Sequence, residues 1–150
     1  MNSSEAAESI VKMSLEGIEV AARITGTGVE RIAVALLAMA KQKQMTKGKT
    51  NLNNMLKSGN PLQIFSLKQE ELKKFHEESK KYGILYTALI DKKHPDTDGL
   101  VDIMVRQQDA IRVNHIFDRF KLSAVNLADI RTEVEKDKME EMLQDAKDRG

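Results

Sequence analysis

The feature that most constrains the fold is a pair of β-forming runs separated by a turn-rich loop. Residues Ile84–Ile90 (ILYTALI) form a continuous apolar run, whereas Leu100–Arg106 (LVDIMVR) alternates. Asp91–Gly99 lies between them and is rich in Pro, Asp and Gly, which is typical of a loop. Alternation beside a continuous apolar run predicts a hairpin with an edge strand and a more buried neighbour. Two sets of side chains should point to opposite faces of the alternating strand: Val101, Ile103 and Val105, and Asp102, Met104 and Arg106.

An amphipathic helix is predicted on each side of this hairpin. Ser66 can cap the first helix, with Gln69 at the capping-box position, and Gly83 suits the left-handed residue that ends it. Asp109 can cap the second helix, whose apolar stripe is Val113, Ile116, Phe117 and Phe120. One-sided helices need a sheet face to cover, so we expect both on the same side of the sheet.

Residues 46–120 are therefore predicted to form a small α+β domain. A short helix over Thr50–Lys57 and a short strand over Leu62–Phe65 precede the first amphipathic helix. The order from that strand onwards is β-α-β-β-α, which is most of a ferredoxin-like or split-βαβ unit.

Residues 1–45 are predicted to form a long N-terminal helix. A heptad seam runs from Val11 to Met39 in steps of four and three, and Thr25 interrupts its apolar stripe. Gly26 and Gly28 each cost about 1 kcal/mol relative to alanine in a helix, so this helix is either kinked or broken there. It either pairs with a copy of itself or lies on the domain's own core. Pairing would give a homo-oligomer held by Leu15, Ile18, Ala22, Val29, Ile32 and Leu36.

Residues 121–150 are predicted to form a charged C-terminal helical tail. Glu133–Glu141 is almost entirely charged, which favours a solvated helix, and a partner-binding helix is the alternative. The apolar residues with helical spacing are Leu127, Ile130, Val134 and Met142.

Composition narrows the class of protein. The chain has no cysteine, which fits a reducing compartment. Its longest uncharged apolar run is Ile32–Ala40, whereas a membrane span needs about 20 residues. The N-terminus is polar and acidic, unlike a signal peptide. We therefore expect a cytoplasmic protein without a membrane span.

No catalytic, metal or cofactor site is predicted. His94, Asp96 and Asp98 resemble part of a calcium loop, but Val105 stands where the closing Glu is required. Gly48-Lys49-Thr50 resembles the end of a P-loop, but the first glycine is replaced by a lysine and no strand precedes it. We expect a protein that is not an enzyme.

Charge is concentrated in one part of the chain. Residues 41–81 contain ten basic and four acidic residues, a net charge of +6, although the whole chain is only +1. Five lysines could neutralise phosphates, and without arginine among them they predict non-specific contact with DNA. The alternative is a solvated lysine loop. The candidate nucleic-acid-binding residues are Lys41, Lys43, Lys47, Lys49 and Lys57.

Three motifs together resemble the PcfB family of conjugative plasmids and integrative elements of Gram-positive bacteria. The motifs are Gly48-Lys49-Thr50-Asn51-Leu52, Lys81-Tyr82-Gly83 before ILYTALIDKK, and Arg106-Gln107-Gln108-Asp109-Ala110-Ile111. The resemblance covers about residues 17–120 and implies a non-enzymatic accessory protein of conjugative DNA transfer. It implies work near the coupling ATPase or the relaxase, and the acidic C-terminal extension departs from the family. An adaptor for those proteins that never touches DNA is the alternative.

Overall fold

Eleven elements make up the described part of the chain. The computed structural model describes residues 8–41, 47–89 and 99–134, and for the helical residues 39–41 and 47–51 it describes the backbone alone. In chain order the elements are β1 (Glu8–Leu15), β2 (Ile18–Thr25), α1 (Val29–Lys41), α2 (Lys47–Lys57), β3 (Leu62–Lys68), α3 (Gln69–Lys81), β4 (Tyr86–Leu89), β5 (Leu100–Arg106), the 3-10 turn η1 (Gln107–Asp109), α4 (Ala110–Arg119) and β6 (Val125–Val134).

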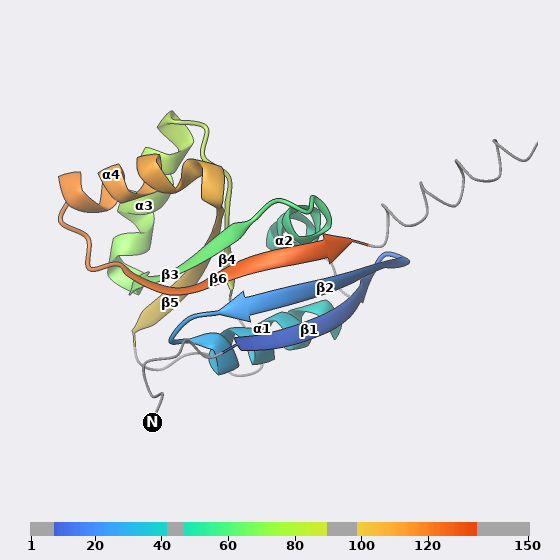
Figure 1. The fold of residues 1–150 in the computed structure, drawn as a ribbon. Coiled ribbons are helices and arrows are strands. Elements are labelled where there is room, and N and C mark those ends of the chain that lie inside the picture. The colour runs from blue at the N-terminus through green and yellow to red at the C-terminus, as the bar shows by residue number, and fades with distance from the viewer. Residues whose placement is uncertain (1–7, 42–46, 90–98, 135–150) are drawn as a thin grey trace, which may run out of the picture.

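The strands form one antiparallel sheet in the order β1-β2-β6-β3-β5-β4 (Figure 1). The predicted layout of a long N-terminal helix, a small α+β unit and a helical tail is therefore wrong. The order strand, helix, strand, strand, helix is present over residues 62–119, but β6 continues the same sheet beside β3. One sheet thus contains strands from each of the three predicted segments.

The N-terminal segment is a hairpin followed by a separate helix. Val11, Met13 and Leu15 of β1 are buried, as are alternate residues of β2, which is a period of two. The strands join at Glu16 and Gly17, whose φ values of 54° and 82° both fit the tight hairpin turn that requires positive φ at two residues. The prediction of a helical heptad seam was wrong because residues four apart, such as Val11 and Leu15, also lie on one face of a strand.

The C-terminal helical prediction is wrong over the residues that the structure describes. Ala128 and Ile130 are fully buried in β6, which is hydrogen-bonded to β2 on one side and β3 on the other. Leu127, Ile130 and Val134 therefore belong to a strand in the middle of the sheet. Met142 and the rest of the predicted tail lie outside the described residues.

Two hydrophobic clusters lie on the two faces of the sheet. The first contains residues of α1 and α2 together with Ile64 and Met104, and the second contains residues of α3 and α4 together with Phe65 and Ile103. The predicted alternation of β5 and the placement of both amphipathic helices on one face are confirmed. β5 is an interior strand between β3 and β4, however, and β4 is the edge, which reverses the predicted order of burial.

The start of α3 also differs from the prediction. Ser66 lies inside β3, and the N-cap residue is Lys68, whose N–H donates to Glu71 Oε1 at 3.3 Å. The Glu71 carboxylate also accepts the N–H of Ser123, which ties the loop before β6 to this helix. Gly83, with a φ of 65°, follows the helix as predicted. No helix of the described residues is long and apolar enough to cross a membrane.

Candidate nucleic-acid interface

The predicted lysine segment lies where α1 ends and α2 begins. Lys41 is the last residue of α1, and Lys47 and Lys49 lie in the first turn of α2. That first turn contains no acidic residue. Lysines at the positive end of a helix dipole are unfavourable for the isolated helix, and an anion there would relieve the repulsion. Lys43 lies outside the described residues, and the side chains of the other three are not described.

Lys57 is separated from this group and is already paired. At the end of α2 its Nζ lies 2.5 Å from Glu16 Oε2, in the turn between β1 and β2. The Lys57 hydrogen bond, followed by its charge, holds the pKa of the Glu16 carboxyl below its ordinary value. Only 19% of the Lys57 side chain is exposed. The structure thus gives Lys57 a partner within the chain, and its contact with DNA stays a prediction.

The six residues proposed for oligomerisation belong to the hydrophobic core or pack against it. Leu15, Ala22, Val29, Ile32 and Leu36 are each at most 4% exposed, and Ile18 packs against the same cluster. They come from β1, β2 and α1, so no continuous helical seam exists. The paired-helix hypothesis is wrong in its geometry, and the prediction of a homo-oligomer remains without that surface.

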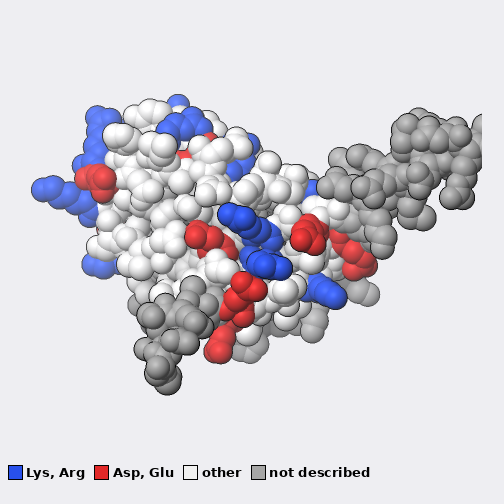
Figure 2. Space-filling view, in the orientation of Figure 1, with Lys and Arg blue, Asp and Glu red and all other residues white. Residues whose placement is uncertain are grey.

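The outer face of β1, β2 and β6 presents a mixed set of charges that sequence reasoning missed. Basic side chains gather over β2 and β6 near the centre of the face in Figure 2, with acidic side chains around them. Arg23 of β2 and Arg131 of β6 are both exposed and are register partners on the two strands. An alternation of charged residues along β6 (D-I-R-T-E) was the available signal, and it was outweighed by the apparent helical spacing.

A groove of about 540 Å³ crosses this face. Its floor includes Ala21, Arg23, Thr25, Asp129, Arg131 and Glu133. Pro61, Leu62 and Gln107 border it where β3 begins and β5 ends. The Gln107 N–H donates to the Pro61 carbonyl at 2.9 Å, which joins these two parts of the border.

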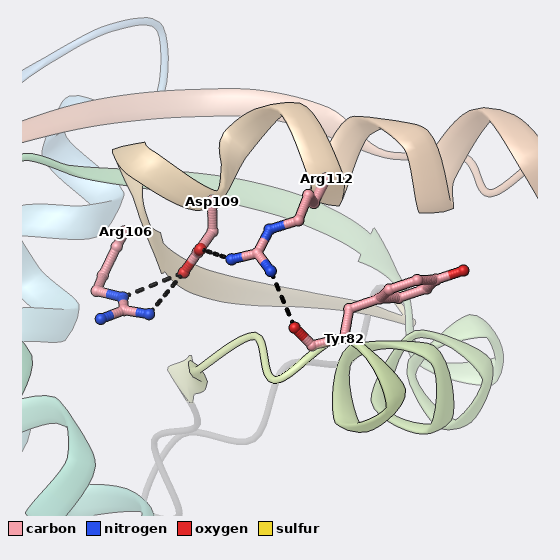
Figure 3. Close-up of polar contacts among 4 residues, drawn as sticks. All are labelled: Tyr82, Arg106, Asp109 and Arg112. Carbon is pink, nitrogen blue, oxygen red and sulfur yellow. Dashed lines mark hydrogen bonds and ion pairs between the residues drawn. The ribbon is translucent and has the colours of Figure 1, made fainter.

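A buried carboxylate lies at the start of α4, between two arginines (Figure 3). Asp109 is 1% exposed, and its carboxylate accepts hydrogen bonds from the guanidinium groups of Arg106 and Arg112. The Arg106 Nη2 to Asp109 Oδ2 distance is 3.0 Å. Arg112 also donates to the Tyr82 carbonyl at 3.0 Å, at the end of α3. Asp109 occupies the predicted N-cap position of α4, but its side chain binds arginines instead of capping the helix.

A smaller pocket of about 230 Å³ lies between the end of α3 and α4. It is lined by Tyr82, Arg112, His115, Ile116, Arg119 and Phe120. Tyr82 is 46% exposed, and Ile111, on the same helix as most of the lining, is 77% exposed. This region combines apolar and cationic side chains. Aromatic and arginine side chains are enriched at the surfaces by which proteins bind one another.

No candidate metal centre is present within the described ranges. No group of three or more His, Asp or Glu side chains there is placed to hold an ion. The predicted loop residues His94, Asp96 and Asp98 lie outside those ranges.

Comparison with known proteins adds a family. A family described as "Protein of unknown function (DUF3801)" matches residues 26–149. No curated protein matches the chain. Among solved structures, the chain is similar to the conserved hypothetical protein Aq1575 from Aquifex aeolicus, with a TM-score of 0.38 and 9% identity over 87% of this chain. The match covers 52% of that protein, so the chain spans about half its length. A likeness this weak supports no inference about fold or function.

Proposed function

The chain belongs to the DUF3801 family, and we propose that this member is a PcfB-like, non-enzymatic accessory protein of conjugative DNA transfer. In this proposal Lys41, Lys43, Lys47 and Lys49 contact the DNA backbone or an acidic partner. The observation that carries it is that Lys47 and Lys49 lie in the first turn of α2, which contains no acidic residue, while Lys41 and Lys43 precede them closely in the sequence. A phosphate there would meet both the lysine charges and the positive end of the helix dipole.

The type of residue predicts the type of contact. Lysine is a flexible point charge, whereas reading of bases relies on Arg, Asn or Gln placed against base edges. The segment contains no arginine. We therefore expect affinity that depends on salt and hardly at all on DNA sequence.

Fluorescence anisotropy with a labelled duplex across a salt series tests the proposal. A variant with Lys41, Lys43, Lys47 and Lys49 changed to Gln should lose affinity and most of the salt slope, since each phosphate contact contributes about 0.9 to that slope. The matched control changes Lys12, Lys73, Lys80 and Lys121 to Gln, which removes the same charge from exposed positions. An equal loss in the control, or no binding by the unchanged chain at low salt, would refute the DNA contact.

An adaptor function is the second candidate, and the α3–α4 pocket favours it. Exposed Tyr82 lines this pocket with Arg112 and Arg119, and exposed Ile111 lies on the same helix as the two arginines. In this proposal they offer a surface for a segment of the coupling ATPase or the relaxase. Pull-down with these two proteins from the same element would decide between the candidates. Capture lost with Ile111→Asp and kept by the lysine variant supports the adaptor, whereas the reverse pattern supports the lysine segment.

A further inference from the structure

The outer face of β1, β2 and β6 is an exposed sheet surface next to a part of the sheet that helices cover. Its outward side chains are exposed or half-buried, while α3 and α4 cover the neighbouring part of the sheet (Figure 1). The groove of about 540 Å³ lies on this outer face, with Pro61 and Gln107 at its border. That volume falls within the range of pockets that hold molecules of nucleotide size, about 300–1,000 Å³.

Two arginines face each other in this groove. Arg23 of β2 and Arg131 of β6 are register partners, so their Cβ atoms lie about 5 Å apart. Like charges directly opposite each other destabilise a sheet. Arg23 has a long ion pair, 3.9 Å from Glu8, and the side chains of Arg23 and Glu8 are each about half exposed. Within residues 8–41, 47–89 and 99–134, Arg131 forms no ion pair.

Carboxylates limit the length of this positive site. Asp129 and Glu133 lie two residues before and after Arg131, about 7 Å away along the strand and on the same face. A chain of phosphates leaving the arginines along β6 would therefore meet a carboxylate in either direction. The arrangement suits one oxyanion held by two guanidinium forks and disfavours an extended polyanion.

We propose that this groove binds a small phosphate monoester of nucleotide size. Arg23 and Arg131 bind the phosphate oxygens, which also removes the repulsion between the two guanidinium groups. The remainder of the ligand lies against Ile10, Ala21 and Pro61, and the side-chain amide of Gln107 forms hydrogen bonds with its polar groups. The site is separate from the lysine segment, because α1 and α2 pack on the other face of the sheet.

Amide chemical shifts measured by NMR test the site with three probes. Inorganic phosphate should shift amides of β2 and β6, a nucleoside 5′-monophosphate should bind more tightly, and the unphosphorylated nucleoside should shift none of them. Arg23→Gln and Arg131→Gln should each weaken binding about tenfold or more, because each removes a charged hydrogen-bond donor group. Lys12→Gln is the control, since it removes the same charge from the same face outside the groove lining.

Thermal unfolding tests the repulsion between the two arginines, which binding measurements do not report. In phosphate-free buffer Arg131→Gln should melt at the same temperature as the unchanged chain or higher, because the repulsion is gone. Added nucleoside monophosphate should raise the melting temperature of the unchanged chain more than that of the variant at the same ligand concentration.

Three results would overturn the proposal. They are no shift of β2 and β6 amides by any probe, equal weakening in Lys12→Gln, and equal binding of the unphosphorylated nucleoside. A 5′-phosphorylated dinucleotide that binds as tightly as the mononucleotide would identify a strand end as the source of the phosphate. Weaker binding of the dinucleotide would identify a free small molecule.

Discussion

At the scale of single residues, Gly26 shows how closely distant segments approach each other. It has a φ of 135°, and a Cβ built on it would lie 2.5 Å from the Leu127 carbonyl oxygen and 2.8 Å from Ala128 Cα. The N–H of nearby Gly28 donates to the same carbonyl at 2.9 Å. The glycines predicted to kink or break a helix therefore form the turn from β2 to α1 where it presses on β6.

Replacement of Gly26 by alanine should destabilise the protein by about 3 kcal/mol or more, because backbone strain and a clash with backbone atoms add together. Urea denaturation measures the loss. Gly83→Ala is the matched control, since Gly83 has a φ of 65° but no heavy atom within 4 Å of its built Cβ. It should cost only about 1–2 kcal/mol. Equal costs at the two sites would show that the close approach to β6 is not energetically important.

At the scale of elements, the two motifs that flank the hairpin meet in space. Arg112 of α4 joins Asp109, in the segment after β5, to the carbonyl of Tyr82 at the end of α3 (Figure 3). The Lys81-Tyr82-Gly83 motif and the Arg106–Ile111 motif are therefore parts of one contact that fixes α3 and α4 relative to each other. The two helices that this contact joins both contribute side chains to the second hydrophobic cluster.

Asp109→Asn should destabilise the chain by about 2 kcal/mol or more. The buried carboxylate would lose its charge while Arg106 and Arg112 remain, and partial exposure of both arginines reduces the loss below that of a fully buried pair. Asp118→Asn on the exposed side of α4 should stay within about 0.5 kcal/mol. Denaturant midpoints that fall equally in both variants would contradict a structural role for the Asp109 contact.

At the scale of the whole molecule, β6 connects the two halves of the sheet. It lies between β2 and β3, so the N-terminal hairpin joins the rest of the sheet through it. Ile130 is fully buried and belongs to the cluster that α1 and α2 cover. The strand closest to the end of the described chain is thus among the most central.

A chain that ends at Phe120 should fail to fold cooperatively, because loss of β6 leaves the backbone groups along one edge of β2 and of β3 unpaired and removes Ala128 and Ile130 from the core. A chain that ends at Val134 keeps every described strand and should unfold in one transition. Circular dichroism during thermal melting distinguishes the two outcomes. A cooperative transition in the shorter chain at an unchanged temperature would mean that β6 is dispensable.

Only part of the candidate sites could be predicted from the sequence. Composition alone located the lysine segment, because it is contiguous in sequence. The pairing of Lys57 with Glu16 and the register of Arg23 opposite Arg131 join residues that are far apart in sequence. No local pattern encodes such neighbours, so sequence reasoning missed both.

The sequence by itself determined the elements whose pattern fits one period. The bounds of β5, the apolar stripe of α4 and the glycine after α3 follow from side chains within each element. Tertiary structure decided the N-terminal hairpin and β6, because spacings of three and four residues are compatible with a helix and, in part, with one face of a strand. Pairing between strands supplies the backbone hydrogen bonds that select the strand, and the partners of those bonds lie elsewhere in the chain.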